Sequence, residues 1–121
     1  MRHRDYKEFS KGSIYHLFNR GNNKERIFLD EQDNKSFLFR IGITLGIDKK
    51  LLKEDGLIGM LKSRVQIIGL PSGLFKLHSF CLMPNHFHIL IEQCGEIPIS
   101  KLMLKVSTSF SMYINKKYKK I

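Results

Sequence analysis

The sequence contains no tryptophan, only two cysteines and only three prolines in its 121 residues. Cys81 and Cys94 are too few and too poorly spaced for a disulfide framework or a cysteine-rich zinc site, and such cysteine usage fits a reducing compartment. No apolar run approaches the roughly 20 residues that a membrane-spanning helix needs, and the N-terminus lacks the apolar stretch of a signal peptide. These absences predict a soluble, cytoplasmic protein with no membrane partner.

Acidic residues are also scarce: 11 Asp and Glu face 21 Lys and Arg, so the formal charge is +10. Such a field attracts polyanions, which makes nucleic acid the expected partner. Charge alone also fits a solvated basic surface without a specific ligand. With 42% hydrophobic residues, the chain is long enough for one compact domain, so residues 1–121 are expected to form a single domain.

Strand and helix patterns alternate along the first half of the chain. Aromatic and branched residues at 13–19 predict a strand that ends in a polar turn at 20–23. Acidic residues at 30–33 precede a helical series of apolar residues, so a helix is expected from about residue 31 to residue 46. Residues 48–73 are interpreted as an extension of that helix followed by an irregular insertion, although 65–70 is β-prone.

The second half begins with two strand-like runs, 74–82 and 86–93. They flank Met83-Pro84-Asn85, which suits a tight turn, so a β-hairpin is expected. Apolar residues then recur at helical spacing after Pro98, which predicts a second amphipathic helix. The order strand, helix, hairpin, helix predicts an α/β (α+β) fold: a ferredoxin-like split βαβ sandwich, in which two helices cover an antiparallel sheet that lacks its last strand.

Two histidines stand out on the second hairpin strand. Residues two apart on a strand face the same side, so His86 and His88 project together, while Phe87, Ile89 and Ile91 point to the opposite face, which is expected to be the core. Two neutral imidazoles can share a divalent ion if a third ligand arrives from elsewhere and neighbouring groups fix their tautomers. The spacing alone also fits two partly exposed histidines without a metal.

The surrounding sequence is more specific than the pair itself. Residues 80–91 are Phe-Cys-Leu-Met-Pro-Asn-His-Phe-His-Ile-Leu-Ile, residues 15–21 are Tyr-His-Leu-Phe-Asn-Arg-Gly, and residues 27–30 are Ile-Phe-Leu-Asp. This context resembles the REP-associated tyrosine transposases and their insertion-sequence relatives, which are single-tyrosine transposases of the HUH class. The resemblance extends to residues 99–103 and 107–118, and so spans most of the chain outside the insertion.

The resemblance implies an enzyme that acts on single-stranded or hairpin DNA as a homodimer. His86 and His88 would hold Mg or Mn beside the scissile phosphate, where the metal acts as a Lewis acid. A tyrosine hydroxyl would attack to form a 5′-phosphotyrosyl link and release a 3′-OH. Such transesterification needs no ATP, which agrees with the lack of a phosphate-binding Gly-rich loop before Lys-Ser/Thr.

The nucleophile has no clear match. In such relatives the catalytic tyrosine lies on a later helix and the third metal ligand follows it by one turn, so both are expected beyond Ile121 and this 121-residue form is expected to be truncated and inactive. The alternative nucleophile is Tyr113, but its apolar series favours core packing with the hydroxyl satisfied at the edge. His16 is open to two interpretations, an active-site neighbour or a satisfied strand histidine.

Two basic segments are expected to contact DNA. The last 21 residues contain no acid, so their lysines can contact phosphates. The turn after the first strand is polar and basic, which suits hairpin DNA or its flanking bases. The expected DNA-binding residues are Asn19, Arg20, Asn22, Lys24, Arg26, Lys101, Lys105, Lys116 and Lys117.

Two other functions compete with the transposase. The first is a non-catalytic ferredoxin-like or RRM-type module whose aromatic residues stack on bases, although neither hairpin strand carries the RNA-binding pattern of that fold. The second is a metal-dependent hydrolase in which Glu92, on the same strand face as His86 and His88, completes the site.

Overall fold

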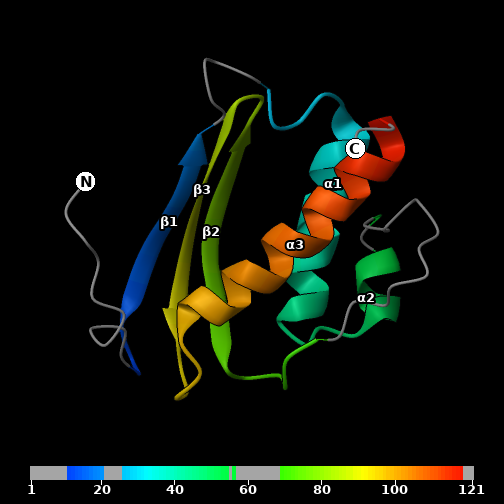
Figure 1. Cartoon of the computed structure of the whole chain (residues 1–121). Helices are drawn as coiled ribbons and strands as arrows, with labels where there is room; N and C mark the ends of the chain where they lie inside the picture. Colours follow the sequence, from blue (N-terminus) through cyan, green and yellow to red (C-terminus); the bar gives the residue numbers. More distant parts are fainter. Residues whose placement is uncertain (1–10, 21–25, 55, 57–68, 119–121) are drawn as a thin grey trace.

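The chain forms one antiparallel sheet with helices on one of its faces, as seen in a computed structural model that describes residues 11–20, 26–54, 56 and 69–118 (Figure 1). No helix in these ranges is long and apolar enough to cross a membrane. The elements in chain order are β1 (Ile14–Arg20), α1 (Glu31–Thr44), α2 (Lys49–Glu54), β2 (Phe75–Met83), β3 (His86–Gln93) and α3 (Ile99–Tyr118).

The sheet has the strand order β1-β3-β2, with β3 in the centre and both neighbours antiparallel to it. β2 and β3 form the expected hairpin, and Pro84 and Asn85 make the turn between them. The crossover from β1 through α1 to β2 leaves room for β3 between the two strands, as a split βαβ arrangement requires. The mixed α+β, ferredoxin-like architecture predicted from the sequence is therefore confirmed.

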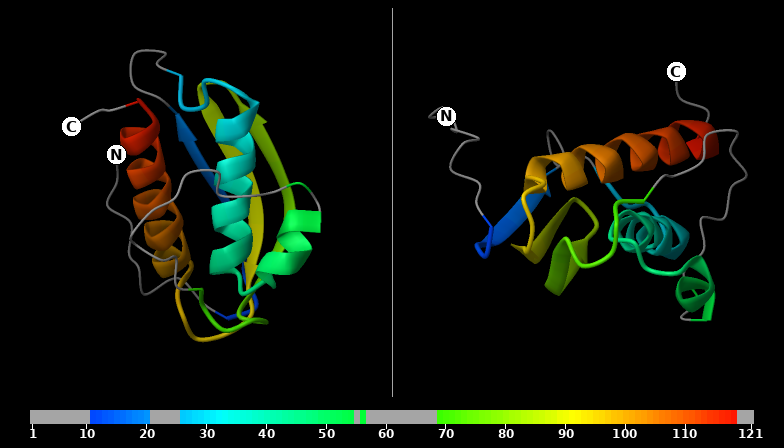
Figure 2. Two further views of the ribbon diagram at one scale, coloured as in Figure 1. Left: turned by 90° about the vertical axis from the view of Figure 1, so that its right-hand side faces the viewer. Right: turned by 90° about the horizontal axis from the view of Figure 1, so that it is seen from below.

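One face of the sheet carries the core. Phe87, Ile89 and Ile91 alternate along β3 and are all buried, which confirms the predicted core face. α1 and α3 lie side by side over this face (Figure 2). Between them and β3, the ring of Phe37 contacts the rings of Phe87 and Phe110 at centroid distances of 4.9 and 5.1 Å. The opposite face of the sheet bears none of the described helices.

α1 starts where predicted but ends sooner, and it does not continue into the insertion. Asp30 caps its first turn, because the Asp30 side chain accepts a 2.9 Å hydrogen bond from Asp33 N. After Thr44, Gly46 takes a φ of +87°, where a Cβ would lie 2.7 Å from the carbonyl oxygen of Leu70. This glycine breaks the helix, so the expected helix extension is wrong: α2 is a separate helix.

α2 packs on α1 through Leu52, which is buried against Gly42. The β-prone run at 65–70 lies outside the described residues except for its last two positions.

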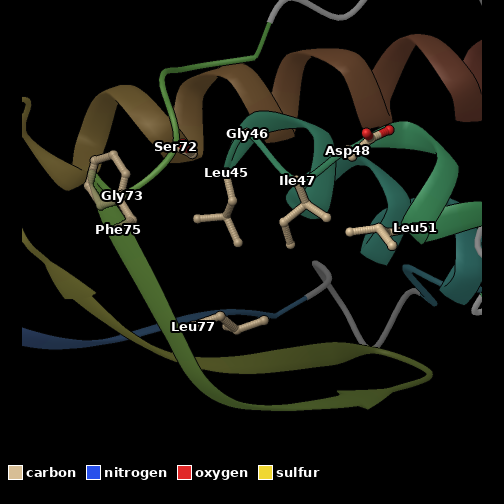
Figure 3. A pocket seen from close by; sticks show the side chains of 9 residues that line it. All are labelled: Leu45, Gly46, Ile47, Asp48, Leu51, Ser72, Gly73, Phe75 and Leu77. Carbon is tan, nitrogen blue, oxygen red and sulfur yellow. The ribbon is translucent and has the colours of Figure 1, made fainter.

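Residues from the end of α1, α2 and the start of β2 line a groove of about 590 Å³ (Figure 3). The described lining is mostly aliphatic and aromatic, and its one ionisable side chain, Asp48, accepts a hydrogen bond from Lys50 N at 2.8 Å. The described residues of the groove therefore offer no set of catalytic groups.

Candidate metal and nucleic-acid site

The open face of the sheet gathers side chains from all three strands. In the register of the sheet, Phe18 of β1 and Cys81 of β2 both lie opposite His88, and His16 lies opposite Leu90. Directly opposed residues share a face, so His16, Phe18 and Cys81 are on the same side as the histidine pair of β3. A shallow hollow runs between His16, Cys81 and His88.

His16, His86 and His88 form what we call the histidine cluster. The ring of His88 stacks on that of His16, with centroids 5.1 Å apart and planes at 19°. The ring of His86 stands at 89° to that of His88, again with centroids 5.1 Å apart. His16 Nε2 and His88 Nδ1 are 2.9 Å apart, within hydrogen-bond distance. His16 therefore lies next to His88, which agrees with its interpretation as a neighbour of the site.

His86 also has a polar neighbour that the sequence did not predict. Its Nδ1 lies 2.7 Å from Oδ1 of Asn85, in the hairpin turn. The turn is fixed from the other side, because the carbonyl oxygen of Pro84 accepts hydrogen bonds from the backbone N–H groups of Ile27 and Phe28 at 2.7 and 3.0 Å. The Met83-Pro84-Asn85 pattern predicted the turn but gave no signal for this contact.

The histidine pair fits a divalent ion in part. His86 and His88 are half-buried on the open face of the sheet. The hydrogen bonds described above involve their Nδ1 atoms and not their Nε2 atoms. Within the described ranges, no three His, Cys, Asp or Glu side chains are grouped so as to hold a metal ion. An ion at this pair would therefore need further oxygen ligands, and phosphate and water are the ligands that Mg²⁺ commonly takes.

Glu92 does not join the histidine pair. Its Oε1 lies 2.9 Å from Nε2 of His78, on the neighbouring strand β2. This hydrogen bond lowers the pKa of Glu92 below its usual range, against the opposing effect of desolvation. With Glu92 directed to His78, the structure offers no support for the hydrolase alternative.

The second polar cluster lies on the helix-covered side and consists of Asp30, Asp33, Tyr113, Lys117 and Tyr118; we call it the Asp33 cluster. Asp33 is fully buried and accepts hydrogen bonds from Lys117 Nζ, Tyr113 OH and Tyr118 OH at 2.8 to 2.9 Å. Its Oδ2 also accepts from Leu29 N at 2.9 Å. These contacts join the start of α1 to the end of α3.

The Asp33 cluster fixes the protonation of its members. Burial alone would raise the pKa of Asp33, but the hydrogen bonds from Lys117, Leu29 and the two tyrosines outweigh it and lower the pKa. Burial and the neighbouring Asp33 raise the pKa of Tyr113 to about 12. Tyr113 is 2% exposed, so the predicted core packing with a satisfied hydroxyl is confirmed. The sheet separates it from His86 and His88.

The expected DNA-binding residues have different surroundings. Lys101 and Lys116 on α3, Arg26 before α1 and Asn19 on β1 are exposed, and Lys105 is half-buried. Arg20 ends β1 directly opposite His86 in the sheet register. Lys117 contributes to the Asp33 cluster through ion pairs with Asp30 and Asp33 at 2.7 and 2.8 Å. Asn22 and Lys24 lie outside the described residues.

The fold and site define a small ferredoxin-like domain that exposes a His-Phe-His strand on an open sheet face. Residues 49–121 match the family described as IS200-like transposase. Because the match covers more than half of the chain, this protein belongs to the IS200-like transposase family, as its resemblance to the insertion-sequence and REP-associated transposases predicted. No significant match was found among curated proteins or among solved structures.

Proposed function

We propose that this transposase domain binds single-stranded hairpin DNA on its open sheet face and holds Mg²⁺ or Mn²⁺ through His86 and His88. The observation that carries the proposal is the histidine pair itself, two half-buried imidazoles side by side on the uncovered face. When bound, the ion supplies Lewis-acid polarisation of the scissile phosphate. The histidines orient that phosphate, and the basic charge of the chain draws the DNA to the domain.

The strand is cut, in this proposal, by a tyrosine hydroxyl that attacks the phosphorus, forms the 5′-phosphotyrosyl bond and releases the 3′-OH. Tyr113 and Tyr118 are poor nucleophiles for this step because both hydroxyls donate to Asp33. Tyr15 packs against the core on the other face. We therefore assign the nucleophile and the third ligand to residues outside the described ranges.

DNA contacts are proposed at the end of β1, beside the histidines, and separately on α3, which lies over the other face of the sheet. Arg20 lies opposite His86 at the end of β1, Asn19 precedes it opposite Phe87, and Asn22, Lys24 and Arg26 continue the segment that follows. Lys101, Lys105 and Lys116 supply phosphate contacts from α3. Lys117 is left out of this set because its ammonium already pairs with two carboxylates. Assembly as a homodimer is part of the proposal and is measured by light scattering of the purified chain.

Calorimetric titration with Mn²⁺ tests the metal site. The wild-type chain is expected to bind the ion, and the double variant His86→Ala/His88→Ala is expected to lose the binding heat. His78→Ala is the matched control, since His78 lies on the same sheet but faces Glu92. Equal binding by the double variant and the wild type would refute the ligand assignment.

Incubation with labelled hairpin DNA separates the transposase from a non-catalytic binding module. An exposed aromatic residue, Phe18 at 68%, favours the module as second candidate, because bases can stack on such a ring. If the histidines serve a metal site, Mn²⁺ should tighten DNA binding in the wild type and not in the double variant. A metal-independent interaction that Phe18→Ala abolishes would favour the module. A covalent adduct that Tyr113→Phe removes would overturn our assignment of the nucleophile.

A further inference from the structure

The hydrogen bond between Asn85 and His86 fixes which ring nitrogen of His86 carries the proton. A side-chain amide oxygen is an acceptor only. Since Oδ1 of Asn85 lies 2.7 Å from Nδ1 of His86, that nitrogen must donate. A neutral imidazole with its proton on Nδ1 has its free lone pair on Nε2. His86 is thereby prepared to offer Nε2 to an ion.

The position of Asn85 is itself determined by the core. Pro84, its neighbour in the turn, accepts two backbone hydrogen bonds from Ile27 and Phe28. Phe28 is 3% exposed and its ring contacts Phe37 and Phe110 under the helices. The turn that carries Asn85 is therefore fixed to the packed interior, which reduces the freedom of the amide beside His86.

His88 has a corresponding neighbour on β1. Its Nδ1 lies 2.9 Å from Nε2 of His16, and the two rings stack. If His88 donates from Nδ1, its Nε2 is free, just as in His86, and His16 accepts with its own Nε2. The reverse assignment would put the proton of His88 on Nε2 and leave the pair with one available nitrogen instead of two.

We propose that Asn85 and His16 are positioning residues that hold His86 and His88 in the Nδ1-protonated tautomer, so that both present Nε2 to one divalent ion. The inference rests on the proposed function for the ion, but the tautomers are properties of the metal-free chain. Neither Asn85 nor His16 is itself a ligand in this arrangement. Outer partners of metal-binding histidines typically change metal affinity by about 10–100-fold when they are removed.

Nitrogen-15 NMR of the histidine rings in the metal-free wild-type chain tests the tautomers directly. His86 and His88 are expected to be protonated on Nδ1. His78 is the internal control with the opposite pattern, because its Nε2 faces the carboxylate of Glu92. Asn85→Ala is expected to shift His86, and not His88, towards the Nε2-protonated form, and Asn85→Asp should restore the Nδ1 form by restoring an acceptor. His16→Phe should shift His88 alone.

A wild-type His86 protonated on Nε2, or a tautomer that does not respond to Asn85→Ala, would overturn the role of Asn85. The same two outcomes at His88 would overturn the role of His16. These readouts need no metal and no DNA, so they stand apart from the test of the proposed function.

Calorimetry with Mn²⁺ tests the second half of the proposal. Asn85→Ala is expected to weaken binding by about 10–100-fold, with Asn85→Asp close to wild type. Asn115→Ala, the same change at an exposed position on α3, is the matched control and should bind as wild type does. Unchanged affinity in Asn85→Ala would refute the link between tautomer and metal. Absence of Mn²⁺ binding by the wild type would refute the proposed metal site, while the NMR result would still decide the tautomers.

Pulsed electron paramagnetic resonance of the Mn²⁺ complex distinguishes positioning from ligation. Two coordinated imidazole nitrogens are expected in the wild type and also in His16→Phe. A third nitrogen that disappears in His16→Phe would show that His16 is a ligand and would overturn its positioning role.

Discussion

The two polar clusters of this domain lie on opposite sides of one sheet and differ in how far their hydrogen-bonding capacity is used. In the Asp33 cluster, the buried carboxylate accepts hydrogen bonds from four donors, one just before α1 and three at the end of α3. In the histidine cluster, the observed contacts use the Nδ1 atoms of His86 and His88 and leave their Nε2 atoms out. A cluster whose polar atoms are all hydrogen-bonded stabilises the fold, whereas a cluster with unused ring nitrogens can bind a ligand.

The largest expected effect comes from removing the centre of the saturated cluster. Asp33→Ala should destabilise the fold by about 3–5 kcal/mol, because it leaves Lys117 and two tyrosines without their common acceptor. His88→Ala should cost less than about 1 kcal/mol, since His88 is only half-buried. Urea denaturation measures both. Glu31→Ala, at an exposed acid in the same turn of α1, is the control and should change stability by no more than about 0.5 kcal/mol. Equal losses in Asp33→Ala and His88→Ala would remove the distinction between the clusters.

A neighbouring pair on β3 sharpens the contrast between the two faces. Ile89 is 1% exposed against the helices, and Leu90 is 38% exposed on the open face. Ile89→Ala should cost about 2–5 kcal/mol through lost burial and a cavity. Leu90→Ala should cost less than about 1 kcal/mol in the isolated chain. Thermal and denaturant unfolding check the pair, and comparable losses would mean that the open face is covered in solution.

Lowering the pH should destabilise the fold through the Asp33 cluster, because Asp33 becomes protonated. The folded pKa of Asp33 is below its ordinary value of 3.8, so its contribution to stability is complete above that pH and is lost as the pH falls through the folded pKa. Unfolding free energy measured from pH 5 downward should therefore fall more steeply in the wild type than in Asp33→Asn below about pH 4. Parallel curves for the two proteins would show that Asp33 is not the group responsible.

The smallest expected effect separates lysines that look alike in the sequence. Lys101→Ala and Lys105→Ala should each reduce the slope of log affinity for single-stranded DNA against log salt by about 0.7, the value for one lost phosphate contact. Lys117→Ala should leave that slope unchanged and instead lower stability, because Lys117 pairs with Asp30 and Asp33. Fluorescence anisotropy across a salt series checks all three. A reduced slope in Lys117→Ala would return it to the DNA-binding set.

Local patterns predicted most of the fold. The alternation on β3 gave both its buried face and its histidine face, and the Pro-Asn turn gave the hairpin. The end of α1 was not predictable in the same way, because Gly46 takes its positive φ against Leu70, which is far along the chain. Helical spacing alone therefore extended the helix too far.

The polar clusters were harder to predict because they depend on long-range approach. Asp33 is 84 residues away from Lys117, and nothing local distinguishes this lysine from an exposed phosphate contact. The sequence left open whether His16 neighbours the histidine pair, and only the register of β1 on β3 decides it. Asn85 was recognised as a turn residue because that role is local, while its contact with His86 depends on side-chain direction.

The close approach of Gly46 to Leu70 also bears on how this domain can change in length. Leu70 N donates to the carbonyl oxygen of Thr44 at 3.0 Å, so these two residues lie side by side although 26 positions of sequence separate them. When the two ends of a segment are held together, doubling the length of a flexible loop between them costs only about 0.6 kcal/mol in closure entropy. The number of residues between Thr44 and Leu70 can therefore change among related sequences while the sheet and its histidines keep their places.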